Sequence, residues 1–364
     1  MRGHRIRPTY LASLTILAVL AFVLGVAYLG PTAGDTQTAE PIESAPARIP
    51  ADEPVARVAS VLSPSVVQIN VMGVQQTPYG TQREEGIGSG VIYRSDGYIV
   101  TNNHVIEGSR QVEVAFADGS TGRGQVVGAD PTTDIAVVKV DRTGLPAASF
   151  SGTDPMVGQT AVAVGSPSGF ESTVTSGIVS GRGREVPAEI TGGQQESSLV
   201  DLIQTDAAIS PGNSGGALAD RDGRVIGINV AYLPPQQTGA ENIGFAIPSR
   251  AATTVADQII YKGRAVHPYL GVYLSDLTSE TARKFGSSVQ TGALIESIEP
   301  GGPADQAGLR QGDVVIAAGN DQVQSSGDLI SALRNYQPGD TLQLSVLRDG
   351  QKETLQVKLA ESPQ

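Results

Sequence analysis

The chain has 364 residues, no cysteine and a formal net charge of -12. The lack of cysteine excludes disulfide bonds, thiol catalysis and cysteine-ligated metal sites. The acidic balance, with no long Lys/Arg block beyond the extreme N-terminus, argues against nucleic-acid binding. The length predicts two domains plus extensions, and the 44 glycines and 22 prolines favour many turns between short strands.

The first 30 residues predict a membrane anchor. Arginines within residues 1–8 precede residues 9–30, which carry no charged side chain, and about 20 apolar residues span a bilayer. A cleaved signal peptide is the alternative, but "PTAG" at 31–34 is a poor cleavage site. Because arginines precede the span and acids follow it, we expect a single pass with a cytoplasmic N-terminus. Residues 31–54, rich in proline, threonine and acids, then predict a flexible linker.

Residues 55–260 predict a domain of short β-strands. Runs of β-branched and apolar residues alternate with the turn signals "SDGY", "ADGS" and "RDGR", and no long helical periodicity interrupts them. Regularly spaced strands are typical of a sandwich or a pair of barrels. A helix over residues 249–262 closes the region, with Ser249 as its N-cap and Gly263 just past its end.

Residues 265–360 predict a compact mixed domain of ordinary size. Strands alternate with short helices, and a final hairpin turns at Asp349-Gly350. The chain shows no internal repeat. The predicted strands cover residues 267–277, 292–300 and 313–320, and the predicted helices cover residues 278–286, 302–308 and 325–336.

Ser214 lies among Gly212, Asn213, Gly215 and Gly216 in the stretch "DAAISPGNSGGAL". Glycine weakens a strand and gives a core no side chain, so these small residues indicate either a loop tip or a backbone that must approach something closely. A serine hydroxyl is a weak nucleophile, which needs a base and needs donors for the charge that develops on the attacked carbonyl. Glycines beside it let backbone N–H groups converge on one point.

The base for such a serine would be one of three histidines. Only His104 lies in the strand-rich region, where a structural histidine at a strand end is the alternative interpretation. Asp134 immediately precedes the apolar run "IAVVKV", and a partly buried acid there needs a partner such as an imidazole N–H. An aspartate that caps the turn "DPTTD" is the alternative. The candidates for the carboxylate that orients the base are Asp130, Asp134, Asp141 and Asp206.

Three blocks, "TNNHVI" with His104, "TTDIAVVKV" with Asp134 and "GNSGGAL" with Ser214, resemble the catalytic blocks of the HtrA (Deg) family of serine proteases. Their order of His, Asp and Ser is that of chymotrypsin-like double barrels. A further block, "IGFAIPS", fits the same family. The resemblance runs from about residue 55 to the C-terminus. It implies a mainly β fold, with a chymotrypsin-like double β-barrel protease domain at 55–260 and a mixed α/β PDZ domain at 265–360.

The resemblance implies a catalytic triad of His104, Asp134 and Ser214. His104 would act as general base and then as general acid, while Asp134 would fix its tautomer and stabilise the imidazolium. The N–H groups of Gly212 and Ser214, with that of Asn213, would form the oxyanion hole. No cofactor is implied, and no metal, because His104 has no nearby carboxylate pair at ligand spacing.

Two further site residues follow from the resemblance. Ile209 would help to line a shallow apolar specificity pocket, which implies cleavage after small aliphatic residues such as Val, Ala or Ile. Arg184 would sense activation from a regulatory loop at 181–198. This loop departs in length and sequence from other members, and a flexible surface loop is the alternative interpretation.

The stretch "YLGV" resembles the carboxylate-binding loop of a PDZ domain. Its N–H groups would hold the terminal carboxylate of a peptide that adds a strand along Val272–Leu274. For Leu329, Ile330 and Leu333 in the following helix, an apolar peptide pocket and ordinary core packing are the two alternatives. The peptide-binding residues would be Tyr269, Leu270, Gly271 and Val272.

One anchor and one PDZ domain resemble the membrane-anchored, DegS-like members of the family. The implied activity is that of an ATP-independent serine endopeptidase, held at the inner membrane with its catalytic domain in the periplasm. Its substrates would be unfolded proteins or a membrane-bound regulatory protein, and C-terminal peptides bound to the PDZ domain would regulate it. The role would be envelope stress response or protein quality control, and the family implies a homotrimer.

Two interpretations from other classes compete with this one. A PDZ scaffold or holdase with a vestigial protease fold would lack a triad residue, and none is missing. An esterase of another fold would show G-x-S-x-G between a strand and a helix, which "GNSGG" does not supply. "GIGSG" at 86–90 superficially resembles a phosphate loop, but no helix follows it. We interpret that stretch as a turn at the entry to a strand.

Overall fold

The structure is a computed structural model, which describes the chain from residue 53 onward. The predicted membrane anchor and almost all of the predicted linker lie outside the described residues. None of the helices in the described part is long and apolar enough to cross a membrane. The described residues are 53–77, 80–166, 172–187, 198–233, 242–284 and 289–362.

The described chain opens with a helix that the sequence analysis did not predict, α2 (Pro54–Leu62). Proline at the first helical position fits a helix start, because its missing N–H would have no helical partner there. Val58 and Leu62 are buried in the main hydrophobic core. A single turn of 3₁₀ helix, Ser63–Ser65, then leads into the first strand.

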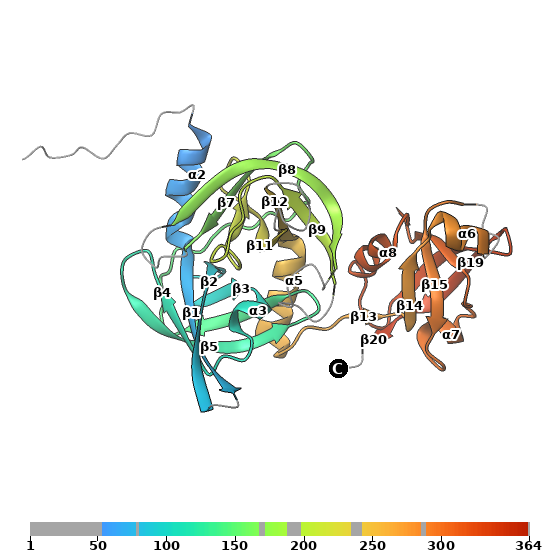
Figure 1. Ribbon diagram of the computed structural model, residues 1–364, viewed down its shortest axis with the longest axis horizontal. Helices are drawn as coiled ribbons and strands as arrows, with labels where there is room; N and C mark the ends of the chain where they lie inside the picture. Colours follow the sequence, from blue (N-terminus) through green and yellow to red (C-terminus); the bar gives the residue numbers. More distant parts are fainter. Residues whose placement is uncertain are drawn as a thin grey trace, which may run out of the picture. The chain divides into compact units, whose positions relative to one another are not determined.

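The first six strands close into a barrel in the order β1-β2-β3-β6-β5-β4 (Figure 1). Its interior is filled by β-branched side chains that alternate along the strands with outward-facing residues. A short helix, α3 (Asn103–Ile106), follows β3 directly. The strands are β1 (Val66–Thr77), β2 (Gly80–Ile92), β3 (Tyr98–Thr101), β4 (Gln111–Ala115), β5 (Thr121–Asp130) and β6 (Ile135–Val140).

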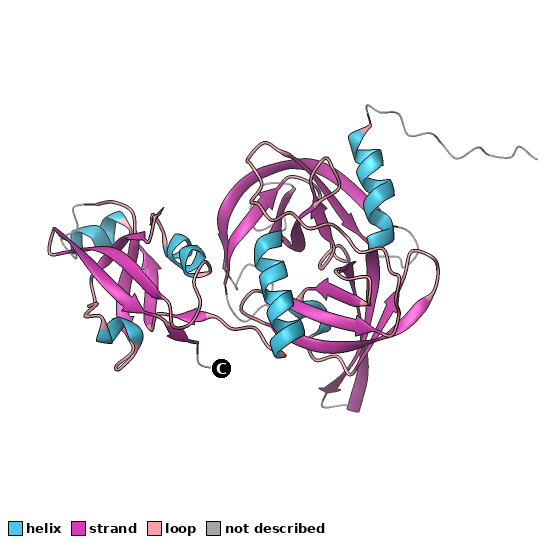
Figure 2. Ribbon diagram, turned by 180° about the vertical axis from the view of Figure 1, so that it is seen from behind, coloured by secondary structure: helices cyan, strands magenta, loops and turns pink. Residues whose placement is uncertain are grey.

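The next six strands close into a second barrel in the order β10-β11-β12-β9-β8-β7, around which β8 forms a long curved strand (Figure 1). The helix α5 (Ser249–Lys262) packs against strands of both barrels, and Figure 2 shows it against their face. The two closed barrels confirm the predicted fold class. The strands are β7 (Thr160–Gly165), β8 (Thr173–Val186), β9 (Leu199–Thr205), β10 (Ala217–Ala219), β11 (Val225–Leu233) and β12 (Ile243–Pro248).

One hydrophobic cluster joins the two barrels to the helices α2 and α5. Val91 and Ile135 of the first barrel belong to the same cluster as Val162 and Ile228 of the second. Ile259 of α5 lies in this cluster too, and it is fully buried. Because the side chains form one contiguous core, the barrels are fixed against each other. A site built between them therefore has rigid walls.

The C-terminal part forms a separate sheet with its own core. Its main path runs β14-β15-β16-β18-β19, so β14 lies at an edge. A capping box between Ser325 and Asp328 begins the helix α8. The elements are β13 (Pro268–Tyr269), β14 (Val272–Asp276), α6 (Ser279–Lys284), β15 (Ala293–Ile298), α7 (Pro303–Gln306), β16 (Val314–Ala318), β17 (Asp321–Gln322), α8 (Ser326–Leu333), β18 (Thr341–Arg348), β19 (Gln351–Lys358) and β20 (Ala360–Glu361).

Several predicted turns are confirmed by the backbone. Gly97, Gly119 and Gly223 of the three predicted "DG" turns all have positive φ angles, which glycine adopts without steric cost. Asp349 and Gly350 also have positive φ, at 49° and 77°, as a tight two-residue hairpin between β18 and β19 requires.

Three local predictions were wrong. Ser249 is the first residue of α5 and not its N-cap, which is Pro248; its hydroxyl donates instead to the Ser151 carbonyl at 2.6 Å. The strand predicted over 267–277 is broken into β13 and β14, because Gly271 has a φ of 77°. The "GIGSG" stretch is not a turn, since it lies inside β2.

The predicted loop at 181–198 is a strand over its first six residues. β8 runs on to Val186 and pairs with β9. Residues 188–197 of that loop lie outside the described residues. The polar and glycine-rich composition hid this strand, because its outer face is exposed to solvent and needs no apolar residues.

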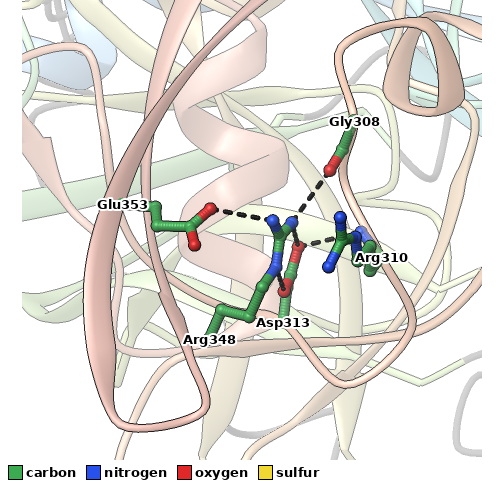
Figure 3. A network of polar contacts seen from close by, with 5 residues as sticks. All are labelled: Gly308, Arg310, Asp313, Arg348 and Glu353. Carbon is green, nitrogen blue, oxygen red and sulfur yellow. Dashed lines mark hydrogen bonds and ion pairs between the residues drawn. The ribbon is translucent and has the colours of Figure 1, made fainter.

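A buried ion pair joins two strands of the C-terminal sheet, at the end of β18 and the start of β16 (Figure 3). The Arg348 guanidinium binds both carboxylate oxygens of Asp313 at 2.7 Å, and it also donates to Glu353 and to the Gly308 carbonyl. The Asp313 side chain is 1% exposed. The backbone N–H of Arg310 donates to the same carboxylate at 2.8 Å. Arg348 thus ties the end of β18 to the loop before β16.

We predict that Arg348→Lys lowers the free energy of unfolding of the C-terminal domain by about 1–3 kcal/mol, because a lysine cannot make the two parallel hydrogen bonds to Asp313. Hydrogen exchange of the amides in this domain of the full-length protein measures the change. Arg310→Lys is the matched control, since only the backbone of Arg310 reaches Asp313. Equal effects of the two substitutions would contradict the prediction.

Candidate active site

His104 and Asp134 form a two-point contact in the first barrel. His104 lies on α3, and not at the end of a strand. Its Nδ1 is 2.8 Å from Oδ2 of Asp134, and its backbone N–H donates to Oδ1 at 2.9 Å. A carboxylate can only accept, so Nδ1 carries the hydrogen and Nε2 of the neutral ring is left as the acceptor. Asp134 therefore sets both the position of His104 and its tautomer.

The backbone turns sharply at Asp134 to make this contact. Asp134 has a φ of 55°, in the left-handed region that aspartate tolerates better than most residues. Its carbonyl accepts hydrogen bonds from the backbone N–H of Asn103 and from Nδ2 of Asn102. The Asp134 side chain is 1% exposed. Asn102 was missed by the sequence analysis; it holds the turn in place from the strand side.

The other candidate carboxylates serve different partners. Both oxygens of Asp130 lie 2.9 Å from Nε2 of His267, beside a hydrogen bond from Thr133. Burial alone would raise the pKa of Asp130, but its hydrogen bond to His267 and the charge of that ring hold it below its ordinary value. Asp206 accepts the N–H of Ile178. Of the four candidates, Asp134 is the one bonded to His104.

Ser214 lies in the loop between β9 and β10, which packs on the strand leading to His104. A Cβ on Gly215 would lie 2.4 Å from Oγ1 of Thr101, three residues before His104. The Ser214 hydroxyl donates to the Val230 carbonyl at 3.3 Å. In the described part of the chain it makes no hydrogen bond with the His104 ring.

The glycines around Ser214 are required by close backbone contacts. Gly212 has a φ of 96° and Gly215 a φ of 82°. A Cβ on Gly215 would also lie 2.1 Å from the Ser89 carbonyl oxygen, and one on Gly216 would lie 2.4 Å from that of Val164. A side chain on Gly215 would push the loop away from the first barrel, and one on Gly216 would push it away from β7 of the second barrel.

The N–H groups of this loop differ in their partners. The N–H of Asn213 donates to the Ser210 carbonyl at 3.0 Å, so it is not free to bind a substrate oxygen. For the N–H groups of Gly212 and Ser214, the described residues provide no hydrogen-bond acceptor. Two of the three predicted oxyanion-hole donors are therefore open in this structure, while Asn213 is engaged elsewhere.

Ile209 and Arg184 are not brought to the Ser214 hydroxyl by any described contact. Ile209 is 7% exposed, and a Cβ on Gly244 of β12 would lie 2.5 Å from its side chain. Arg184 lies on the exposed face of β8, opposite Leu202 of β9, with its guanidinium over Gly181. The described residues contain no group of three or more ligand-type side chains that could hold a metal ion.

The predicted peptide-binding loop joins β13 to β14. The Leu270 carbonyl accepts from the N–H of Ala304, and the Gly271 carbonyl accepts from the N–H of Glu299. These bonds fix the loop against the start of α7. The Tyr269 hydroxyl donates to the Glu299 carboxylate, and Val272 is the first residue of the edge strand β14.

The apolar residues of α8 divide between core and surface. Leu329 and Leu333 are buried in the core of the C-terminal domain, at 0% and 9% exposure. Ile330 is half-buried. The interpretation of Leu329 and Leu333 as ordinary core residues is therefore the one that the structure supports.

Two family models match the chain. A trypsin-like peptidase domain matches residues 88–228, and a PDZ domain matches residues 268–359. A solved HtrA-type protease, AlgW with decapeptide, is 34% identical, with a TM-score of 0.67 over 85% of this chain and 99% of that chain. AlgW with tripeptide is 36% identical, with a TM-score of 0.68 over 85% of this chain and 98% of the other.

Curated relatives point the same way. A probable periplasmic serine endoprotease, DegP-like, of Marinomonas sp. (strain MWYL1) is 38% identical over 290 residues, which is 79% of this chain and 60% of the relative. The chain thus spans about 60% of that relative's length. The putative serine protease HhoB of Synechocystis sp. is 39% identical over 301 residues, which is 80% of this chain and 70% of the relative. The chain belongs to the HtrA family of serine proteases.

Proposed function

We propose that the chain is a serine endopeptidase in which His104, Asp134 and Ser214 form the catalytic triad. The observation that carries the proposal is the two-point contact between His104 and a fully buried Asp134. A buried carboxylate needs compensation, and here the compensation orients an imidazole with its other nitrogen ready to accept a proton. The glycine-lined loop of Ser214 packs on the strand beside it.

The proposed reaction follows from these positions. The Ser214 hydroxyl attacks the scissile carbonyl while Nε2 of His104 takes its proton, and Asp134 stabilises the imidazolium that forms. The open N–H groups of Gly212 and Ser214 bind the oxyanion. His104 then protonates the leaving amine, and a water molecule activated by the same nitrogen hydrolyses the acyl-enzyme.

We further propose that C-terminal peptides bind to the PDZ domain and regulate this activity. β14 is an edge strand to which a peptide could add. Arg334, the C-cap residue of α8, lies 3.8 Å from Asp201 of β9, and Arg250 of α5 donates to Asn335. Burial raises the pKa of Asp201 and lowers that of Arg334. Burying these two charges therefore costs free energy, and part of that cost would be recovered if the two side chains moved apart into solvent.

Asp201 links this contact to the predicted sensor. Its neighbour in β9, Leu202, pairs with Arg184 of β8. A peptide that shifts α8 would therefore act on the strand pair that carries Arg184. This arrangement supports the proposal that Arg184 transmits the effect of peptide binding to the Ser214 loop.

The proposed setting is the periplasmic side of the inner membrane, with residues 9–30 as the anchor and a homotrimer as the assembly. Relatives named periplasmic proteases support an extracytoplasmic catalytic domain. A stress-sensing protease with a membrane-bound regulatory substrate and a general quality-control protease are the two forms of this proposal. They differ in whether activity depends on peptide.

We predict that the full-length protein cleaves an unfolded, casein-like substrate and that peptides ending in apolar residues accelerate it. Ser214→Ala should abolish cleavage, by roughly a thousandfold or more, because the nucleophile is lost. Ser210→Ala, in the same loop, is the control that should stay active. If cleavage does not depend on peptide, the quality-control form of the proposal is the one supported. If the protein binds peptide but cleaves nothing, a role as a scaffold is favoured.

We predict that cleavage follows Val, Ala and Ile, because we propose that Ile209, which packs on Gly244, lines a shallow specificity pocket. Ile209→Ala should raise the ratio of kcat/KM for Leu or Phe to that for Val by about tenfold or more. Ile203→Ala, another buried isoleucine of this barrel, should leave the ratio unchanged. Mapping the cut sites by mass spectrometry tests both statements. Wild-type cleavage mostly after Lys or Phe would refute the assignment.

A further inference from the structure

Ser89, in the "GIGSG" stretch of β2, lies at the centre of a hydrogen-bond network that reaches the Ser214 loop. It is fully buried. Its hydroxyl donates to the Gly212 carbonyl at 2.6 Å and accepts from the N–H of Ser166 at 2.8 Å. Its partners lie more than 70 residues away along the chain, in the second barrel. Nothing in the assigned chemistry of the triad uses this side chain.

The backbone of Ser89 makes two more hydrogen bonds, one with the Ser214 loop and one with β3. Its N–H donates to the Ser214 carbonyl at 2.8 Å, and its carbonyl accepts from Oγ1 of Thr101 at 2.7 Å. Thr101 ends the strand that leads to His104. One residue of the first barrel therefore holds the carbonyl groups of both Gly212 and Ser214.

These are the two residues whose N–H groups are open for an oxyanion. Gly212 has no side chain to restrain it, and its φ of 96° is one of several conformations open to glycine. The peptide plane after Gly212 is bonded at both ends, because its oxygen meets Ser89 and its N–H, on Asn213, meets Ser210. A peptide unit is planar, so these two bonds fix its orientation and restrict the ψ angle of Gly212.

We propose that Ser89 is a positioning residue for the oxyanion hole: its hydroxyl holds the Gly212 carbonyl so that the N–H groups of Gly212 and Ser214 converge on one oxygen. This inference rests on the proposed function. Ser89 does not touch the substrate, and it acts through Gly212. The role also explains why β2 carries a small hydroxyl residue here, between Gly88 and Gly90, whose own Cβ positions are blocked by Val105 and Ile99.

The test compares Ser89→Ala with the wild-type full-length protein, assayed on a fluorogenic peptide cut after Val and with a peptide boronic acid ending in the valine analogue. The boronate adduct is tetrahedral and places an oxygen in the hole. We expect kcat to fall ten- to a hundredfold, because a displaced donor loses part of the hundred- to thousandfold effect of a deleted one. KM should change less than twofold, and boronate affinity should fall in parallel with kcat/KM.

Ser249→Ala is the matched control. Ser249 is equally buried, and its hydroxyl donates to a distant backbone carbonyl at the same distance of 2.6 Å, but it lies at the start of α5. It should lower the melting temperature without changing kcat per folded molecule. If Ser89→Ala behaves in the same way, or raises only KM, the positioning role is overturned.

A second variant covers the case in which Ser89→Ala does not fold. Ser89→Cys keeps the shape of the side chain, but its thiol is a weak donor and too long to hold a carbonyl at 2.6 Å. We expect kcat to fall three- to tenfold with KM unchanged, and an unchanged kcat would overturn the inference. Failure of the proposed function is distinguishable, because then the wild type would show no turnover or Ser214→Ala would keep it.

Discussion

The burial of one carboxylate, that of Asp134, is the constraint on which the site depends. A charge removed from water must be compensated nearby, and the first barrel compensates it twice from a single residue, through the ring and the backbone N–H of His104. The left-handed backbone at Asp134 and the hydrogen bonds from Asn102 and Asn103 to its carbonyl hold Asp134 where it makes this contact. In the proposed mechanism the imidazole is thereby held before substrate binds, so little reorganisation is left for the proposed reaction.

The two halves of the site belong to different barrels, and their alignment is a packing problem. His104 and Asp134 lie in the first barrel, whereas Ser214 lies in the second. The shared core fixes the barrels at long range, and the backbone contacts between β2 and the Ser214 loop fix them locally. Gly215 is needed because its backbone lies too close to the Ser89 carbonyl for a Cβ, whereas Gly88 and Gly90 are needed because side chains pack against them.

The sequence predicts the parts of the fold that local chemistry determines. Alternating apolar residues predict the strands, and "DG" pairs predict the turns at Gly97, Gly119 and Gly223. What it could not decide depends on distant partners. Four aspartates look alike in sequence, and only the folded backbone shows that Asp134 meets His104 while Asp130 meets His267. The strand at "GIGSG" was missed for the same reason, because the side chains that leave no room for a Cβ at its glycines belong to other elements.

Barrel closure has a consequence for where the chain exposes strand edges. Each strand of the two barrels has a neighbouring strand on both sides, so the closed part of each ring has no lateral edge that could template the growth of a β-aggregate. In the described chain, open strand edges occur in the C-terminal sheet, at β14 and β19, and in the outer part of the β1–β2 hairpin, where residues 73–77 and 80–84 pair only with each other. Addition of a strand from another chain is therefore directed to these edges and away from the closed rings.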